Sequence, residues 1–117
     1  MKEQLLERIQ ILLRAEMIDK IVAEFCENVT DYILDAKPDA DEEKLGMLIT
    51  HLAMGIQRLI KNQEEAPVDN IVLDSVKQEP CFSEAEKLAD FIILKCPVHF
   101  NKTESDFLKI HLCNLMA

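Results

Sequence analysis

Glycine, tryptophan and clustered basic residues are what this sequence has least of. Its 117 residues contain only two glycines, no tryptophan and 5% aromatic residues. Because β-hairpins depend on glycine in their tight turns, so few glycines argue against a sheet built from hairpins. No stretch alternates apolar and polar residues over the length of a strand, so we expect no sheet. With 49% hydrophobic residues, the chain is predicted to form one all-α domain with an aliphatic core.

Positive charge is scarce as well. The formal net charge is -9, and no run of lysines and arginines interrupts the acidic composition. Proteins that bind nucleic acid directly obtain most of their affinity from clustered basic side chains. We therefore expect no direct contact with nucleic acid, and an acidic surface favours a basic protein partner instead.

Long apolar segments are also missing. No apolar run is long enough to span a bilayer, and no apolar segment follows a basic lead as it does in a secretion signal. These absences predict a cytoplasmic protein without membrane contact.

The four cysteines, Cys26, Cys81, Cys96 and Cys113, form no C-x-x-C pair. Reduced cysteines in the core of a cytosolic protein are the expected reading. The sharper alternative is a zinc site, because Cys96 and His99 have C-x-x-H spacing. Pro97 lies between them and no second ligand pair is visible, so we expect no metal and no cofactor.

The spacing of apolar residues predicts a compact bundle of about five to six helices. The first three expected helices are Lys2 to Arg14, Ile18 to Lys37, which Pro38 ends, and Glu42 to Asn62. A short helix follows Asp69 and is ended by Pro80. The last two helices are expected to begin at the capping box Ser83–Glu86 and at the weaker box Thr103–Asp106. Asp39 and Asp41 are both plausible N-caps of the third helix. A break between the first two helices is not decidable, because no glycine or proline punctuates residues 15–17.

The predicted helix over residues 42–62 has two faces of different character. Its core face contains Leu45, Leu48, Leu52, Ile56 and Leu59. His51 and Arg58 are two turns apart on the other side, together with Met47 and Met54. Because the core face is already supplied, we interpret this second face as functional. The methionines make it an adaptable apolar interaction face.

The last predicted helix contains a similar arrangement, with Glu104 two turns before His111. A single histidine is ordinarily a half-buried residue with a satisfied hydrogen bond, and His99 in its loop is expected to be an exposed bystander. Phosphoryl acceptance makes modest demands on a histidine, which must be neutral near pH 7 and accessible to a donor protein. Arg58 is suited to hold phosphate oxygens, and Glu104 to orient an imidazole by accepting its ring N–H.

The residues that hydrolysis or nucleotide binding would require are missing from the sequence. There is no G-x-S-x-G elbow for hydrolysis, and no glycine-rich loop to bind a nucleotide phosphate. The many carboxylates fall in first turns of helices and on solvated faces. We therefore do not expect an enzyme.

Several of these segments resemble the phosphotransferase-system (PTS) regulation domain, or PRD, of bacterial antiterminators and PTS-controlled activators. The segments are Leu48–Leu59 and Thr103–Leu112, similar to the two histidine motifs of that family, and Asn70–Lys77 and Phe82–Ala89, similar to the segments between them. The resemblance extends from about Ile18 to the C-terminus. It is specific in order and spacing, and loose in residue identity.

The resemblance implies a helical bundle that dimerises and is phosphorylated on histidine by the phosphocarrier HPr or by an EIIB domain. By position, His51 and His111 are the candidate phosphoacceptors, and Arg58 and Glu104 are their partners. The domain organisation expected is an N-terminal helical extension, residues 1–17, packed on a PRD-like domain, residues 18–117. The function expected is a stand-alone regulatory module that acts in the control of carbohydrate-related transcription through a dimer or an unknown output protein.

Two features depart from the family pattern. Thr50 precedes the first histidine, where the family commonly has an acidic residue. The chain is also expected to have no output domain of its own. Both features favour an alternative, a PRD-fold interaction and dimerisation module that is not phosphorylated. A small helical enzyme or metal protein remains a third alternative.

Overall fold

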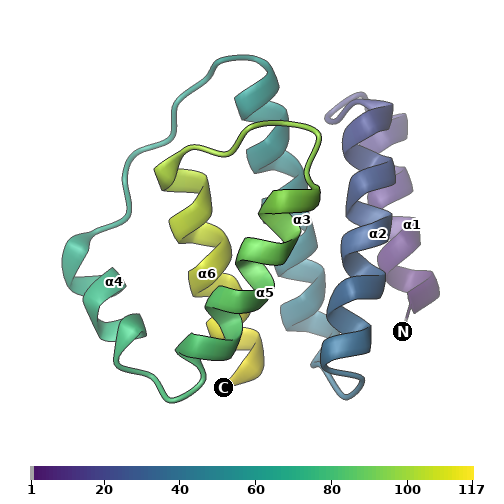
Figure 1. Cartoon of the computed structure of the whole chain (residues 1–117). Coiled ribbons are helices and arrows are strands. Elements are labelled where there is room, and N and C mark those ends of the chain that lie inside the picture. Colours follow the sequence, from purple (N-terminus) through teal and green to yellow (C-terminus); the bar gives the residue numbers. More distant parts are fainter. Residues whose placement is uncertain (1) are drawn as a thin grey trace.

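The computed structural model describes residues 2–117, and these residues form six α-helices (Figure 1). The helices are α1 (Lys2–Arg14), α2 (Lys20–Ala36), α3 (Glu42–Ile60), α4 (Asn70–Lys77), α5 (Phe82–Lys95) and α6 (Lys102–Met116). No strand occurs in this part of the chain. The prediction of an all-α bundle is confirmed.

The first two helices are separate, joined by a tight turn without glycine. Glu16 has a φ of 60°, which lies in the left-handed region that non-glycine residues seldom adopt. Asp19 then precedes α2, but its carboxylate makes no capping bond to that helix. Instead the Gln57 side chain of α3 accepts from the Asp19 backbone N–H at 2.8 Å and donates to the Asp19 carboxylate at 3.0 Å. A buried glutamine therefore fixes the start of α2 against α3.

Helix α3 lies at the centre of the bundle. It packs against α1, α2 and α6, while α5 packs mainly along α6 (Figure 1). Its predicted core face is buried except at Leu59, which is half-buried, and Ile49, Ala53 and Gln57 are buried in addition. Because three helices surround α3, its buried surface is wider than the single stripe expected from the sequence.

Two helix starts differ from the sequence-based expectation. Helix α5 begins at Phe82, so Ser83 lies inside it and forms no cap; Cys81 and Phe82 pack on the core and set an earlier start. Helix α6 begins after Asn101, whose side chain accepts from the Glu104 backbone N–H at 2.9 Å. Both predicted capping boxes are therefore wrong. The N-caps expected at Asp41 and Asp69 are present.

Helix α4 lies at the side of the bundle, after a connector that crosses over from the end of α3 (Figure 1). It contacts α6 and buries Leu73, whereas Ile71 and Val72 remain exposed. None of the helices within residues 2–117 has the length and apolarity needed to cross a membrane.

The N-terminal helix belongs to the same core as the other helices. Leu5 and Ile9 of α1 are fully buried, and α1 packs on α2 and α3. The division of the chain at residues 17 and 18 is not tested by this packing and stays a prediction.

Candidate functional site

The two histidines predicted as functional lie against each other where α3 and α6 pack together. The ring centroids of His51 and His111 are 4.7 Å apart, and the ring planes are inclined by 23°. The rings are therefore stacked, although one comes from the middle of α3 and the other from the C-terminal half of α6. His51 is exposed to solvent and His111 is half-buried. The ring of His51 is therefore accessible to solvent, whereas that of His111 is partly shielded from it.

A small cavity of about 20 Å³ lies beside the stacked rings. That volume is enough for one water molecule, which needs about 10–15 Å³. Three polar side chains line it, His51, His111 and Glu104. Its remaining walls are apolar, and they are formed by Leu48, Leu52, Ile56, Phe100, Phe107 and Leu108. Phe100 of the α5–α6 loop is buried while the neighbouring His99 is exposed, so His99 lies outside this site, as the sequence predicts.

Burial lowers the pKa of His111 below its ordinary value of 6.5, and the positive charge that His51 can acquire lowers it further. Both effects disfavour the imidazolium form. His111 is therefore neutral near pH 7, and a neutral imidazole has a free nitrogen lone pair.

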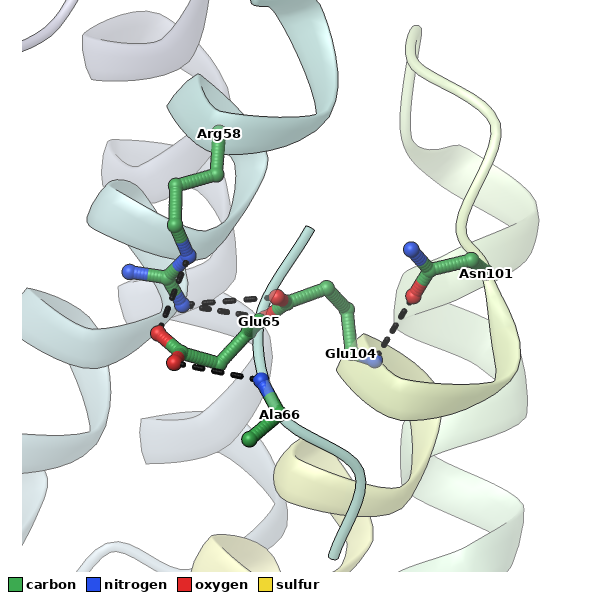
Figure 2. Close-up of polar contacts among 5 residues, drawn as sticks. All are labelled: Arg58, Glu65, Ala66, Asn101 and Glu104. Carbon is green, nitrogen blue, oxygen red and sulfur yellow. Dashed lines mark hydrogen bonds and ion pairs between the residues drawn. The ribbon is translucent and has the colours of Figure 1, made fainter. Parts of the chain in front are cut away.

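The two charged residues predicted as partners of the histidines form an ion pair with each other. The Arg58 Nη2 lies 3.4 Å from Glu104 Oε1 and 3.3 Å from Glu104 Oε2 (Figure 2). The Glu104 side chain is 7% exposed and that of Arg58 is 26% exposed. Sequence reasoning placed Arg58 with His51 and Glu104 with His111, each pair along one helix. In the structure, Arg58 of α3 pairs with Glu104 of α6. His51 of α3 likewise stacks on His111 of α6.

Arg58 has a second carboxylate neighbour that the sequence did not indicate. Glu65, in the connector after α3, places Oε2 3.5 Å from Arg58 Nε (Figure 2). This contact is an ion pair that lacks hydrogen-bond geometry. The buried Nε–H of Arg58 is therefore left without a hydrogen-bond acceptor. Arg58 therefore links α3, α6 and the connector, and its Nε retains an unused donor.

Gly55 is a site residue that the motif analysis did not single out. A β-carbon at this position would collide with Oε1 of Glu104 and lie 3.2 Å from its carboxyl carbon. Only glycine leaves the carboxylate room to lie against α3 next to Arg58. A glycine inside a helical pattern is the signal that could have indicated such a close approach.

Thr50, the residue before His51, is engaged by the N-terminal helix. Its hydroxyl donates to the Gly46 carbonyl at 2.9 Å and accepts from Arg8 Nη1 at 3.4 Å. The Arg8 guanidinium also covers Gly46, where a β-carbon would lie 3.1 Å from its central carbon. Helix α1 thus contacts the turn of α3 that precedes His51.

The two methionines of the predicted interaction face differ in exposure. Met47 is 51% exposed, whereas Met54 is half-buried and packs against the core. Of this face, Met47 provides the open apolar surface. Within residues 2–117, no cluster of histidine, cysteine or acidic side chains has the arrangement of a metal site.

A comparison against models of known protein families identifies the family of this chain. The model of the PRD family, described as the PRD domain, matches residues 15–115. The chain therefore belongs to the PRD family, and the resemblance inferred from its motifs is confirmed. Membership in this family indicates a regulatory role related to the phosphotransferase system. A search of curated proteins and a search of solved structures found no match.

Proposed function

We propose that this domain is phosphorylated on histidine by HPr or by an EIIB domain, at His51 or His111. The observation that supports this most directly is the stacking of these two rings at the α3–α6 contact. In a chain that belongs to the PRD family, the two histidines most similar to the family motifs occupy one site. Each histidine taken alone could be a half-buried residue with a purely structural role. That alternative does not explain why two histidines lie together.

The proposed reaction moves a phosphoryl group between two imidazoles. With HPr as the donor, the phosphorus–nitrogen bond of its phosphohistidine breaks, and the donor ring leaves with the electron pair. A lone pair of His51 or His111 forms the new nitrogen–phosphorus bond. The lowered pKa of His111 supports the neutral state that this attack requires. We propose His51 as the first acceptor, because its exposed ring is the more accessible to a donor protein.

Arg58 and Glu104 are proposed to transmit the change. A phosphoryl group brings a charge of about −1.5 to −2 to a site next to the Glu104 carboxylate. Like charges repel, and the new phosphate competes with Glu104 for the guanidinium of Arg58. The ion pair that joins α3 to α6 is thereby weakened, and the packing of the two helices changes.

We further propose that the altered packing is recognised by an output protein or by a second copy in a homodimer, in the cytoplasm of a bacterium. The process served would be the control of carbohydrate-related transcription. Residues 1–17 are proposed as an extension of the regulatory domain over residues 18–117, because Arg8 of α1 contacts Thr50 next to His51.

The test is incubation of the purified protein with phosphoenolpyruvate, enzyme I and HPr, with and without an EIIB domain, followed by intact mass measurement. We expect an acid-labile gain of one phosphoryl mass, reduced in His51→Ala and absent in the His51→Ala, His111→Ala double variant. His99→Ala is the matched control, because His99 is an exposed histidine outside the site. The proposal fails if the wild type gains no such mass, or if the double variant gains as much.

A second candidate function is a PRD-fold interaction module without phosphorylation. The half-exposed side chain of Met47 favours it, since methionine adapts to varied apolar partners. Under this reading, Met47→Glu abolishes self-association or partner binding, while His51→Ala has no effect on either. Sedimentation of the two variants beside the wild type, before and after incubation with phosphoenolpyruvate, enzyme I and HPr, distinguishes this reading from the first.

A further inference from the structure

Cys81 and Cys113 lie in contact where the start of α5 meets the last turns of α6. Their Sγ atoms are 3.0 Å apart. The Cys81 Sγ also lies 3.4 Å from the backbone carbonyl oxygen of Cys113, to which it donates. Among the residues described, this is the one pair of cysteines whose sulfur atoms are in contact. Both thiols are free.

The other two cysteines provide a comparison. Cys26 is fully buried in α2, and Cys96 follows the last residue of α5. Burial raises the pKa of the Cys26 thiol to about 12 and also raises that of Cys96. What separates them from Cys81 and Cys113 is geometry, because among the residues described neither has a sulfur–sulfur contact with another cysteine. These two cysteines are therefore not expected to form an intramolecular disulfide.

Conversion of the Cys81–Cys113 contact into a bond requires little movement. The sulfur atoms must approach by about 1 Å to reach a bond length of about 2.05 Å. Cys81 is preceded by Gln78, Glu79 and Pro80, all exposed, in the turn between α4 and α5. A turn with exposed residues accommodates such an adjustment more readily than a packed helix does.

The two thiols differ in accessibility. Cys81 is half-buried, whereas Cys113 is only 2% exposed. Burial, together with the neighbouring Cys81, raises the pKa of the Cys113 thiol to about 12. An oxidant therefore reacts first at Cys81, and Cys113 is positioned to attack the oxidised sulfur.

An open groove of about 370 Å³ between α4 and α6 borders Cys113 of this pair, whereas Cys81 does not line it. Val76 and Glu79 line it on one side, and Ile110, His111, Cys113 and Asn114 line it on the other. The same groove borders His111, two residues before Cys113 on α6.

We propose that Cys81 and Cys113 are a redox pair that forms a reversible intramolecular disulfide in the presence of a peroxide. In the first step the Cys81 sulfur attacks the peroxide, the oxygen–oxygen bond breaks, and a sulfenic acid and one water form. In the second step the Cys113 sulfur attacks the Cys81 sulfur, the sulfur–oxygen bond breaks, and hydroxide leaves as water with the thiol proton. Two thiols are oxidised, one peroxide is reduced, and a dithiol such as dithiothreitol reverses the change.

The disulfide joins the turn before α5 to the C-terminal part of α6. It constrains the α6 segment that contains His111, and it closes a loop between residues 81 and 113 in the unfolded chain. The oxidised protein is therefore expected to unfold at a higher denaturant concentration than the reduced protein. The inference does not depend on phosphorylation of either histidine.

The experiment treats the reduced full chain with hydrogen peroxide and measures the intact mass under denaturing conditions. We expect the wild type to lose the mass of two hydrogen atoms and to regain it with dithiothreitol. After trypsin digestion, the peptides Gln78–Lys87 and Ile110–Ala117 should be linked to each other. Cys81→Ser and Cys113→Ser should each abolish the loss, and Cys96→Ser should retain it.

Circular dichroism of each variant establishes that it is folded, and Cys81→Ser, at a partly exposed position, keeps the test decisive if Cys113→Ser does not fold. No mass loss in the wild type overturns the inference. It is also overturned if Cys81→Ser still loses this mass, or if the linked peptides contain Cys26 or Cys96.

Discussion

The carboxylate of Glu104 on α6 occupies the space that a β-carbon at position 55 of α3 would need. Oε1 of Glu104 lies too close to that position for any residue but glycine, and Arg58 Nη2 lies 3.5 Å from the same position. The glycine, the carboxylate and the guanidinium therefore form one contact between the helices that bear the two histidines. This contact leads to two predictions about stability.

Gly55→Ala should destabilise the protein, although alanine is the better helix former. The gain in helix propensity is about 1 kcal/mol, whereas displacement of packed groups by an added methyl costs about 1–3 kcal/mol. Urea denaturation measures the change in the free energy of unfolding. Gly46→Ala is the matched control, because its β-carbon would meet only the end of the long Arg8 side chain. The close approach of Glu104 is contradicted if both variants are stabilised equally.

Glu104→Gln should cost about 1–3 kcal/mol of unfolding free energy, because it leaves the charge of a largely buried Arg58 without its main partner. Lys102→Ala is the control, since it breaks an ion pair with Asp106 in which the lysine is mostly exposed. Surface pairs of that kind contribute about 0–1 kcal/mol. Urea titrations of both variants give the comparison. A larger loss for Lys102→Ala would contradict the weight given to the Arg58–Glu104 pair.

The free energy of unfolding should depend on pH through His111. Its pKa is lowered in the folded protein, so the unfolded chain binds the proton more readily. Above the ordinary pKa of 6.5, neutral His111 makes its full contribution to the free energy of unfolding. This contribution is lost as the pH falls from 6.5 to the pKa of His111 in the folded protein. Urea denaturation above and below pH 6.5 should show this loss. His111→Gln should reduce the loss, and His99→Gln should leave it unchanged.

A direct measurement of the same ionisation is available from NMR. The C2–H resonance of His111 should titrate with a midpoint below 6.5, because of burial and the charge of His51 opposite it. Glu104 lines the same cavity, and a carboxylate close to an imidazole would favour its charged form. A midpoint at or above 6.5 would show that its carboxylate outweighs the other two effects.

Gln57→Ala should destabilise the protein by about 1–2 kcal/mol, because it removes two hydrogen bonds at the start of α2 and leaves a small cavity. Through these two bonds the Gln57 side chain joins Asp19 to α3. Gln63→Ala, in the exposed connector, is the control. The role of Gln57 as a cap from a distant helix is contradicted if Gln57→Ala unfolds at the same urea concentration as the wild type.

Much of the fold could be predicted from the sequence because its signals are local. Apolar spacing and Pro38 predict the helices, and Asp41 and Asp69 cap the helices they precede. The start of α5 could not be predicted, because packing of Cys81 and Phe82 on the core sets it. The start of α6 is set by the side-chain cap of Asn101, a local signal that was assigned to Thr103 instead. Ser83 and Thr103 have the right chemistry for caps but lie inside helices.

The members of the candidate site could be listed from the sequence, but their arrangement could not. Spacing along one helix indicates which residues share a face, and so it joined His51 to Arg58 and Glu104 to His111. Which face of α6 meets α3 is a long-range property. It decides that the rings stack on each other and that Arg58 meets Glu104. Glu65 was missed for the same reason, since its connector has no periodic pattern.

Arg58 is the common anchor for parts of the chain that otherwise share few contacts. Through Glu65 it holds a connector whose residues 61–67 are all exposed, and through Glu104 it holds the beginning of α6. Loss of this one positive charge therefore leaves two carboxylates, on two different segments, to repel each other at the same place. One side chain thus helps to hold both the connector that leads to α4 and the first turn of α6.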